Sequence, residues 1–214
     1  ERINPAFTAL TGYSEEEAIG QTMAMLKSER HSLLFYQRMW ESIKQDYRWQ
    51  GEIWNKRKNG EIYPELLTIT AVTADDLSIT HYIASFSDIT EDKEAEAQIH
   101  RLAYYDHLTS LPNRRLLQDR LIQAIAATSR HSAYGAIFFI DLDKFKLLND
   151  THGHDIGDLL LVEIAQRLKQ LVRKSDTVAR HGGDEFMILL EDLSVNIEEA
   201  ATLANQLGEK IFES

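Results

Sequence analysis

The chain lacks cysteine, long apolar runs and a surplus of basic residues. Because none of its 214 residues is cysteine, disulfides, zinc–thiolate sites, iron–sulfur clusters and cysteine nucleophiles are excluded. No apolar run approaches the roughly 20 residues that span a bilayer. Lys and Arg number 23 against 34 Asp and Glu, which gives a net charge of −11. This balance argues against general nucleic-acid binding, although it is compatible with a nucleotide whose charge is met by divalent metal ions.

The remaining composition is that of a soluble, globular protein. Hydrophobic residues make up 43% of the chain, and the length allows one large or two small domains. The absence of cysteine is consistent with a cytoplasmic location. The chain starts at Glu1 without a Met and enters in mid-pattern, so we interpret it as a fragment whose parent could carry a targeting or membrane segment outside it.

The first ninety residues show a pattern of short helices followed by strands. Ser14 and Glu17 form a capping-box signal for a short helix, with Gly20 as its stop. A second helix is expected over residues 31–45. Strand-like segments follow at 49–54, 62–70 and 81–86. This order predicts an α+β domain with an antiparallel meander.

Several motifs in this segment resemble those of PAS sensor domains. They are Asn4-Pro5-Ala6-Phe7, Thr11-Gly12-Tyr13-Ser14, the hairpin turn Lys58-Asn59-Gly60, and Asp88-Ile89-Thr90-Glu91. The resemblance implies a PAS domain over residues 1–90 whose first strand is missing. PAS domains hold a small ligand or cofactor in the cup of the sheet, or serve as dimerisation modules.

The sequence does not identify a PAS ligand. Without cysteine, the photoreactive flavin–thiol chemistry of one PAS subfamily is excluded. His31 is a candidate haem ligand, but a solvated histidine is the favoured interpretation. Trp40, Trp49 and Trp54 are candidates for stacking on a flavin, although packing in a core or interface is favoured for each.

Residues 88–104 are predicted to form a signalling linker helix capped by Asp88 with Glu91. Ala95, Ile99 and Leu102 repeat at four and three residues and form a narrow apolar seam. Such a seam predicts a parallel two-stranded coiled coil between identical chains. The alternative is an amphipathic helix that lies on its own domain.

Two acidic sites mark the second half of the chain. The apolar run at 135–140 predicts a strand that is buried on both faces and ends at Asp141. Gly182-Gly183 predicts the tip of a β-hairpin, and Asp184 and Glu185 follow it on opposite faces of a strand. Carboxylates of Asp141 and Asp184 on neighbouring strands could share Mg²⁺ ions. The alternatives are a helix cap for Asp141 and a solvated surface hairpin.

The intervening residues provide groups that suit a nucleotide. A helix is expected to begin at Pro112. Three amphipathic faces are predicted from apolar spacing: Leu117, Leu121 and Ile125; Ile156, Leu160, Ile164, Leu168 and Leu171; and Ile197, Ala201, Ala204, Leu207 and Ile211. Lys146 lies near a helix start, where a phosphate can bind, or else it is a solvated lysine.

Polar side chains with base-reading chemistry follow Lys146. Asn149 and Asp158 carry the donors and acceptors that read a purine edge. Arg173 and Asp176 suit a guanine and a phosphate, or form an ordinary surface ion pair.

Residues from about 102 onward resemble the GGDEF family of diguanylate cyclases. The matching motifs are Asp106-x-Leu108-Thr109-x-Leu111-x-Asn113-Arg114, Asp141-x-Asp143-x-Phe145-Lys146-x-x-Asn149-Asp150, Gly153-His154-x-x-Gly157-Asp158 and Gly182-Gly183-Asp184-Glu185-Phe186. The resemblance implies a GGDEF domain over 105–214. Its α/β fold is palm-like, of the nucleotide-cyclase type, with a central, mainly antiparallel sheet and flanking helices. The implied reaction converts two GTP into cyclic di-GMP and two pyrophosphates.

The resemblance also implies residue roles. Mg²⁺ or Mn²⁺ is held by Asp141, Asp184 and the backbone carbonyl of Leu142. The catalytic residues are Asp184, as proton acceptor, Glu185 and Lys146. The substrate-binding positions are Asn149, Asp158, His154, Phe145 and Lys146. The product-inhibition site, an RxxD motif, is Arg173 and Asp176.

One departure from the family is the expected absence of its C-terminal strand pair and last helix, which carry basic residues for the triphosphate. The alternatives for the fragment itself are therefore weak GTP binding or inactivity, even if the parent enzyme is active. We therefore predict a PAS-regulated diguanylate cyclase that dimerises through its PAS domain and linker helix. Its partners are GTP and cyclic di-GMP, with no nucleic acid. One alternative is a catalytically silent GTP-binding module that regulates an attached phosphodiesterase domain. The other is a fragment used for sensing and dimerisation.

Overall fold

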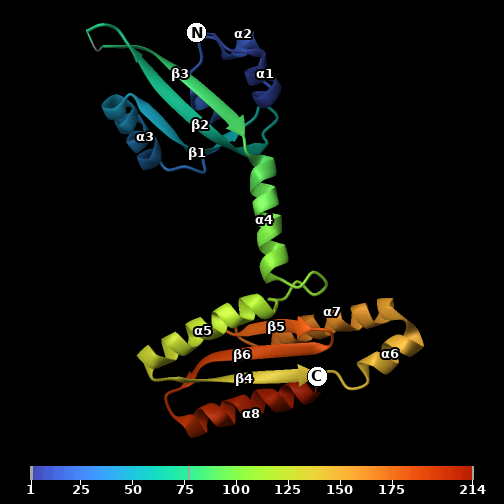
Figure 1. Cartoon of the computed structure of the whole chain (residues 1–214). Coiled ribbons are helices and arrows are strands. Elements are labelled where there is room, and N and C mark those ends of the chain that lie inside the picture. Colours follow the sequence, from blue (N-terminus) through green and yellow to red (C-terminus); the bar gives the residue numbers. More distant parts are fainter. Residues whose placement is uncertain (1, 77, 214) are drawn as a thin grey trace. The chain divides into compact units, whose positions relative to one another are not determined.

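The computed structural model describes residues 2–76 and 78–213, with the side chains of 129–131 excepted (Figure 1). Contacts divide the chain into two compact units, Glu1–Ala97 and Gln98–Ser214. α4 (Thr90–Tyr104) runs from the first unit into the second. Within the described residues, none of the helices combines the length and apolarity that a membrane crossing requires.

In its described part, the first unit consists of a series of helices followed in the chain by a three-stranded antiparallel sheet. The helical elements are α1 (Pro5–Thr11), α2 (Glu15–Ala18), the 3-10 helix η1 (Met23–Leu26) and α3 (Leu33–Asp46). The strands β1 (Arg48–Lys56), β2 (Ile62–Thr73) and β3 (Ile79–Asp88) pair in the order β1-β2-β3. α3 packs on the sheet through a cluster that includes Met39, Ile43 and Ile53. The predicted helices and meander are confirmed.

The local signals in the first unit form as predicted. The Ser14 hydroxyl accepts from the Glu17 N–H at 3.3 Å, and the Glu17 carboxylate accepts from the Ser14 N–H at 3.0 Å. The capping box is therefore present. Gly60 closes the turn between β1 and β2 with φ +90°, a left-handed conformation that glycine adopts without steric cost.

The His31 ring is held by contacts within the domain and is half-buried. Its Nε2 accepts a hydrogen bond from the Trp54 N–H at 2.8 Å, and the ring stacks on Phe35 at 4.1 Å. Burial lowers the pKa of His31, which favours the neutral ring that this hydrogen bond requires. The half-buried position makes the favoured interpretation, a solvated histidine, wrong. The contacts give no support to a haem ligand either, because this ring nitrogen is already used.

A buried acid lies within the sheet of the first unit. Glu65 on β2 is 1% exposed. Asn55 donates a hydrogen bond to its Oε1 at 2.8 Å, and the Tyr63 hydroxyl contacts its Oε2 at 2.8 Å. Both carboxyl oxygens therefore have a partner, as buried polar groups require.

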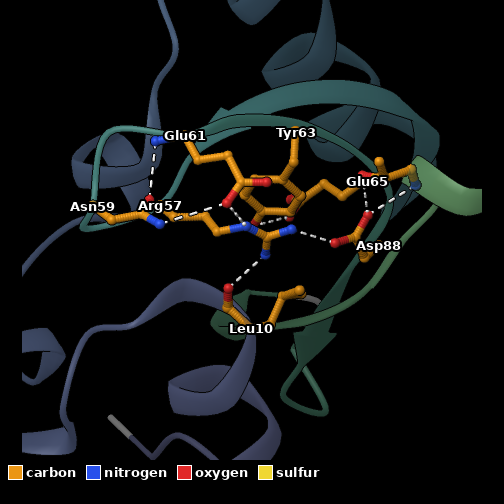
Figure 2. A network of polar contacts seen from close by, with 8 residues as sticks. Leu10, Arg57, Asn59, Glu61, Tyr63, Glu65 and Asp88 are labelled. Carbon is orange, nitrogen blue, oxygen red and sulfur yellow. Dashed lines mark hydrogen bonds and ion pairs between the residues drawn. The ribbon is translucent and has the colours of Figure 1, made fainter.

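An ion pair beside this acid fixes the start of α4 (Figure 2). The Arg57 guanidinium pairs with Asp88 and donates to the Leu10 carbonyl at 2.6 Å. It also lies over the Tyr63 ring, 3.9 Å from the centroid. Asp88 in turn accepts from the Thr90 N–H at 2.8 Å, so the predicted cap by Asp88 is present at the first residue of α4.

Replacing Glu65 with Gln is expected to flatten the pH dependence of stability. Burial raises the pKa of Glu65, and so does the nearby Asp88, while Tyr63, Asn55 and Arg57 act in the opposite direction. Because the folded pKa lies above the unfolded value of about 4.3, stability from this group is complete below that value. It is lost as the pH rises through the folded pKa. A Gln keeps the buried hydrogen bonds without titrating, so the variant avoids this loss.

Urea unfolding from about pH 5 to about pH 8 measures this effect as the change in the free energy of unfolding. The matched control is Glu41→Gln, which alters an exposed acid on α3. We expect the control to follow the wild type and the Glu65→Gln curve to diverge upward with pH. Parallel curves for all three proteins would contradict the buried-acid account.

In the described part of the second unit, helices lie on both faces of a second antiparallel sheet. The helices are α5 (Arg114–His131), α6 (Phe145–His152), α7 (His154–Leu171) and α8 (Ile197–Glu213). The strands β4 (Tyr134–Asp141), β5 (Thr177–Gly182) and β6 (Glu185–Ser194) pair in the order β4-β6-β5. Figure 1 shows this sheet between α5 and α8.

Alternate side chains of β6 point to opposite faces of the sheet and belong to two different hydrophobic clusters. Met187 and Leu189 pack with Leu117 of α5. Phe186, Ile188 and Leu190 belong to the other cluster, which includes residues of α7 and α8. Because successive strand residues point to opposite faces, α5 covers one face of the sheet and α7 with α8 cover the other.

The predicted burial of β4 is wrong. Within the described residues β4 lies at the edge of the sheet, with Phe139 76% exposed, whereas β6 is central. An apolar run is compatible with an edge strand as well as with a central strand. The order of the strands depends on pairing between distant segments, which the run itself does not indicate.

Three helix details also differ from the prediction. α5 begins at Arg114 because the Asn113 side chain caps it, accepting from Arg115 N–H at 3.0 Å. Ile125 and Ile156 were expected to face inward but are 60% and 46% exposed. The buried residues of α7 are Gly157, Leu161, Ala165 and Leu168. Of the predicted inward face, Leu168 is therefore confirmed and Ile164 packs against the core cluster.

Candidate functional site

The β5–β6 hairpin turns one residue later than predicted. Gly182 pairs with Glu185, so the turn consists of Gly183 and Asp184. A register shift between Arg180 and Gly182 causes this displacement, because a bulge adds a residue to one strand. Gly183 has φ +54°, which glycine tolerates. Asp184 therefore lies in the turn, and the expectation that it sits on a strand opposite in face to Glu185 is wrong.

An arginine holds this turn in place. The Arg180 guanidinium donates to the Gly183 carbonyl at 3.0 Å from Nε and at 2.7 Å from Nη2. Its Nη1 donates to both oxygens of Asp106 at 3.1 and 3.2 Å. The two side chains are only 11% and 16% exposed. Arg180 thus links the backbone next to Asp184 to a carboxylate at the start of the unit.

Asp106 is itself fixed by its own loop. It accepts from the Thr109 N–H at 2.8 Å and from the Thr109 hydroxyl at 2.6 Å. Burial acts to raise the pKa of Asp106, but the hydrogen bonds from Thr109 and Arg180 outweigh it and hold that pKa below its usual range. No role for Arg180 or Asp106 was predicted from the sequence, because a pair separated by 74 residues leaves no local signal.

The two candidate metal ligands lie at the same end of the sheet. Asp141, the last residue of β4, is the register partner of Glu185, and Asp184 is the next residue along. Cα atoms of directly opposed residues are about 4.5–5.5 Å apart in an antiparallel ladder. The expected pairing of the two strands is therefore present. Asp141 is exposed and Asp184 is half-buried.

The donor set at this end fits Mg²⁺. It comprises two carboxylates and the Leu142 carbonyl, and Mg²⁺ prefers oxygen ligands with places left for water and phosphate. Among the described residues, no three His, Asp or Glu side chains are grouped so that they could hold a metal ion by themselves. Oxygens from a bound phosphate would therefore have to complete the coordination.

A pocket of about 500 Å³ opens beside Asp141. The residues at the end of β4 and the start of α6, including Leu142 and Phe145, form one wall, and Leu160 and Ile164 of α7 form another. Its volume is in the usual range for small-molecule sites. Of the predicted site residues, Asp141, Leu142 and Phe145 line it, whereas Lys146 is exposed and lies outside the lining.

Three of the predicted substrate-binding residues lie on α6 and α7. Asn149 is half-buried on α6, and His154 and Asp158 are exposed in the first turns of α7. Gly153, with φ +87°, is the single residue between the end of α6 and the start of α7. None of these three side chains lines the pocket.

Glu185 and the Arg173–Asp176 loop complete the predicted set. Glu185 is exposed and lies 3.1 Å from His181 Nδ1. Asp176 accepts from the backbone N–H of Arg173 at 2.9 Å and from that of Glu191 at 3.4 Å. Within the described residues, the exposed Arg173 guanidinium forms no ion pair, so the ordinary surface pair between Arg173 and Asp176 is not present.

Comparisons with known proteins identify the families to which the two halves of the chain are similar. A diguanylate cyclase GGDEF domain matches residues 103–213, and a PAS domain matches residues 1–91. The bifunctional diguanylate cyclase/cyclic di-GMP phosphodiesterase MucR of Pseudomonas aeruginosa is 50% identical over 119 residues, which cover 56% of this chain and 17% of that protein. The signaling protein YkoW of Bacillus subtilis is 32% identical over 204 residues, which cover 94% of this chain and 25% of that protein.

A solved structure shares the fold of the second unit. The coiled coil and GGDEF domain of DgcB from Caulobacter crescentus, in complex with c-di-GMP, is 28% identical with a TM-score of 0.51 and covers 57% of this chain and 61% of that one. The chain spans a quarter or less of the length of the curated relatives above. With just over half of its residues matched, the chain belongs to the diguanylate cyclase GGDEF family, and a PAS domain precedes its GGDEF domain.

Proposed function

We propose that the protein containing this chain is a PAS-regulated diguanylate cyclase that condenses two GTP into cyclic di-GMP and two pyrophosphates. The main support is the position of Asp184 in an arginine-held turn, next to the register partner of Asp141. The two residues lie at the same end of the sheet, and Asp141 lines a pocket of about 500 Å³. Membership of the family supplies the reaction class.

The chain's own residues would act as follows. Asp141, Asp184 and the Leu142 carbonyl would hold Mg²⁺, which neutralises phosphate charge when bound. Lys146 and the backbone N–H groups at the start of α6 would bind phosphate oxygens. Asp184 would accept the proton of a 3′-hydroxyl as its oxygen forms a bond to the α-phosphorus of the second GTP. The bond to the β-phosphate breaks, and pyrophosphate leaves.

A direct assay tests this proposal. Incubation of a protein that contains this chain with a complete GGDEF domain, in the presence of GTP and Mg²⁺, is expected to yield cyclic di-GMP detectable by mass spectrometry. GTP binding without product would favour the other candidate, a silent module that regulates an attached phosphodiesterase. That candidate is kept because the similar protein MucR is bifunctional.

The reaction joins two GTP molecules, each held by one subunit, so a homodimer is part of the proposal. The seam residues Ile99 and Leu102 of α4 are 68% and 66% exposed. None of the described residues of α4 is buried. This exposure favours a coiled coil between two copies over a helix lying on its own domain.

Replacing Leu102 with Asp is expected to shift the protein toward monomers and to lower cyclase activity, because the charge interrupts the seam. Analytical ultracentrifugation measures the dimer constant, which we expect to weaken by about tenfold or more. Ala97→Asp, an equal charge change at an exposed position off the seam, is the control. A dimer constant unchanged by Leu102→Asp would rule out the seam as the interface.

Replacing Arg173 with Ala is expected to weaken product inhibition and to leave initial turnover unchanged. The exposed guanidinium is available to a phosphate of cyclic di-GMP, whereas Asp176 is engaged with the backbone of its loop. Initial rates at rising cyclic di-GMP measure the effect, with the exposed neighbour Lys174→Ala as control. If Arg173→Ala abolished turnover instead, the assignment of Arg173 to an inhibitory site would be wrong.

A further inference from the structure

One buried oxygen between α6 and α7 has no partner. Oδ1 of Asn149 is buried, and within the described residues it accepts no hydrogen bond. Buried polar atoms in native proteins are rarely left in this state, and an exception calls for an explanation such as a ligand or a water. A carboxamide oxygen is an acceptor, so the missing partner is a donor.

The absence of a side chain at Gly157 leaves the space that the Asn149 amide occupies. A Cβ atom at position 157 would lie 1.9 Å from Oδ1 of Asn149 and 2.9 Å from its Cγ. It would also lie 3.2 Å from Cζ of Phe145. The residue is buried in α7 and has no left-handed φ that would call for glycine. Close approach of the Asn149 side chain is therefore the reason that glycine is needed here.

We propose that Gly157 is a positioning residue of the nucleotide site, because its missing side chain sets where the Asn149 amide can read a guanine base. The inference rests on the proposed function. Asp158, the other predicted base-reading residue, follows Gly157 directly on α7. Guanine presents N1–H and a 2-amino group as neighbouring donors. Adenine has an acceptor at N1 and no 2-amino group, so acceptors at Asn149 and Asp158 discriminate against it.

The proposal predicts how Gly157→Ala changes binding. The added methyl displaces the Asn149 amide and presses on Phe145, whereas contacts to the triphosphate are unaltered. Affinity for a non-hydrolysable GTP analogue is expected to fall by about 10- to 100-fold, the range of one lost hydrogen bond to a buried group. Affinity for the ATP analogue is expected to stay the same, so the preference for guanine narrows.

Calorimetric titration of the chain with both analogues and Mg²⁺ tests this. The matched control is Gly208→Ala, another helical glycine, whose Cβ would meet Phe138 at 3.3 Å; it is expected to bind as the wild type does. Gly157→Ala with unchanged affinity and preference would overturn the inference while leaving the proposed function intact. A wild-type chain that binds no GTP analogue would overturn both.

A double-mutant cycle distinguishes displacement of the Asn149 amide from general destabilisation of the domain. Asn149→Ala is expected to narrow the guanine preference as Gly157→Ala does. Adding Gly157→Ala to Asn149→Ala is expected to have little further effect, because the amide that it displaces is gone. The double variant also removes the severe clash, so it provides the test even if Gly157→Ala folds poorly. Equal losses from Gly157→Ala in both backgrounds would show that Gly157 does not act through Asn149.

Discussion

Asp184→Asn is expected to abolish cyclic di-GMP formation while the chain still binds GTP. An amide cannot accept the proton of the 3′-hydroxyl, and it is a much weaker ligand for Mg²⁺ than a carboxylate. Loss of a positioned general base alone costs about 100- to 10,000-fold. Stability should change little, because Asp184 is half-buried in a turn whose position depends on the hydrogen bonds from Arg180 to the Gly183 carbonyl.

Single-turnover assays with GTP and Mg²⁺, together with binding of a non-hydrolysable analogue, measure both parts of this prediction. Asp119→Asn, which alters an exposed acid on α5, is the matched control and should retain full activity. Turnover of Asp184→Asn within a few-fold of the wild type would contradict the role of Asp184.

Arg180→Ala is expected to lower kcat more than it raises KM. The guanidinium makes two hydrogen bonds to the Gly183 carbonyl and two to Asp106. Without it, the turn that carries Asp184 loses the side-chain link that joins it to Asp106. A displacement of about 1 Å in a catalytic group can cost about 100-fold in rate. Stability should also fall by about 1–3 kcal/mol, because the half-buried Asp106 loses its cationic partner and keeps only the hydrogen bonds from Thr109.

The comparison with Arg120→Ala distinguishes positioning from general destabilisation. Arg120 donates to the Thr177 hydroxyl at 2.9 Å, at the far end of β5 from the turn, so its loss should lower stability without changing kcat. Arg180→Lys keeps the charge but not the fork of donors, and we expect it to recover part of the activity. A folded Arg180→Ala protein with wild-type kcat would show that the arginine does not position Asp184.

Much of the fold follows from short-range signals. The capping box of Ser14 and Glu17 and the turn at Gly60 depend on residues within a few positions of one another, and the structure contains both. The order of strands in the second sheet could not be predicted in this way. The runs that form β4 and β6 are both apolar, and only pairing with distant strands makes β6 the central one.

The candidate site was predictable in its residue types but not in its backbone. The motifs located Asp141 and Asp184, and β4 and β6 do pair as expected. The turn was predicted one residue too early because of the bulge before Gly182. Arg180, beside this bulge, contacts Asp106, which is 74 residues away in the sequence, so no local pattern indicates it. The close packing of Asn149 against Gly157 was not predicted for a similar reason. Close approach between two helices is a tertiary property, and a helical glycine alone does not indicate it.

The most direct test of the central claim is to locate a metal ion by anomalous scattering. Crystals grown with Mn²⁺ and a non-hydrolysable GTP analogue would give a peak at each bound ion. We predict a peak within coordination distance of both the Asp141 and the Asp184 carboxylates, with the nucleotide phosphates completing its ligands. An ordered nucleotide whose metal ions contact neither carboxylate would contradict the account.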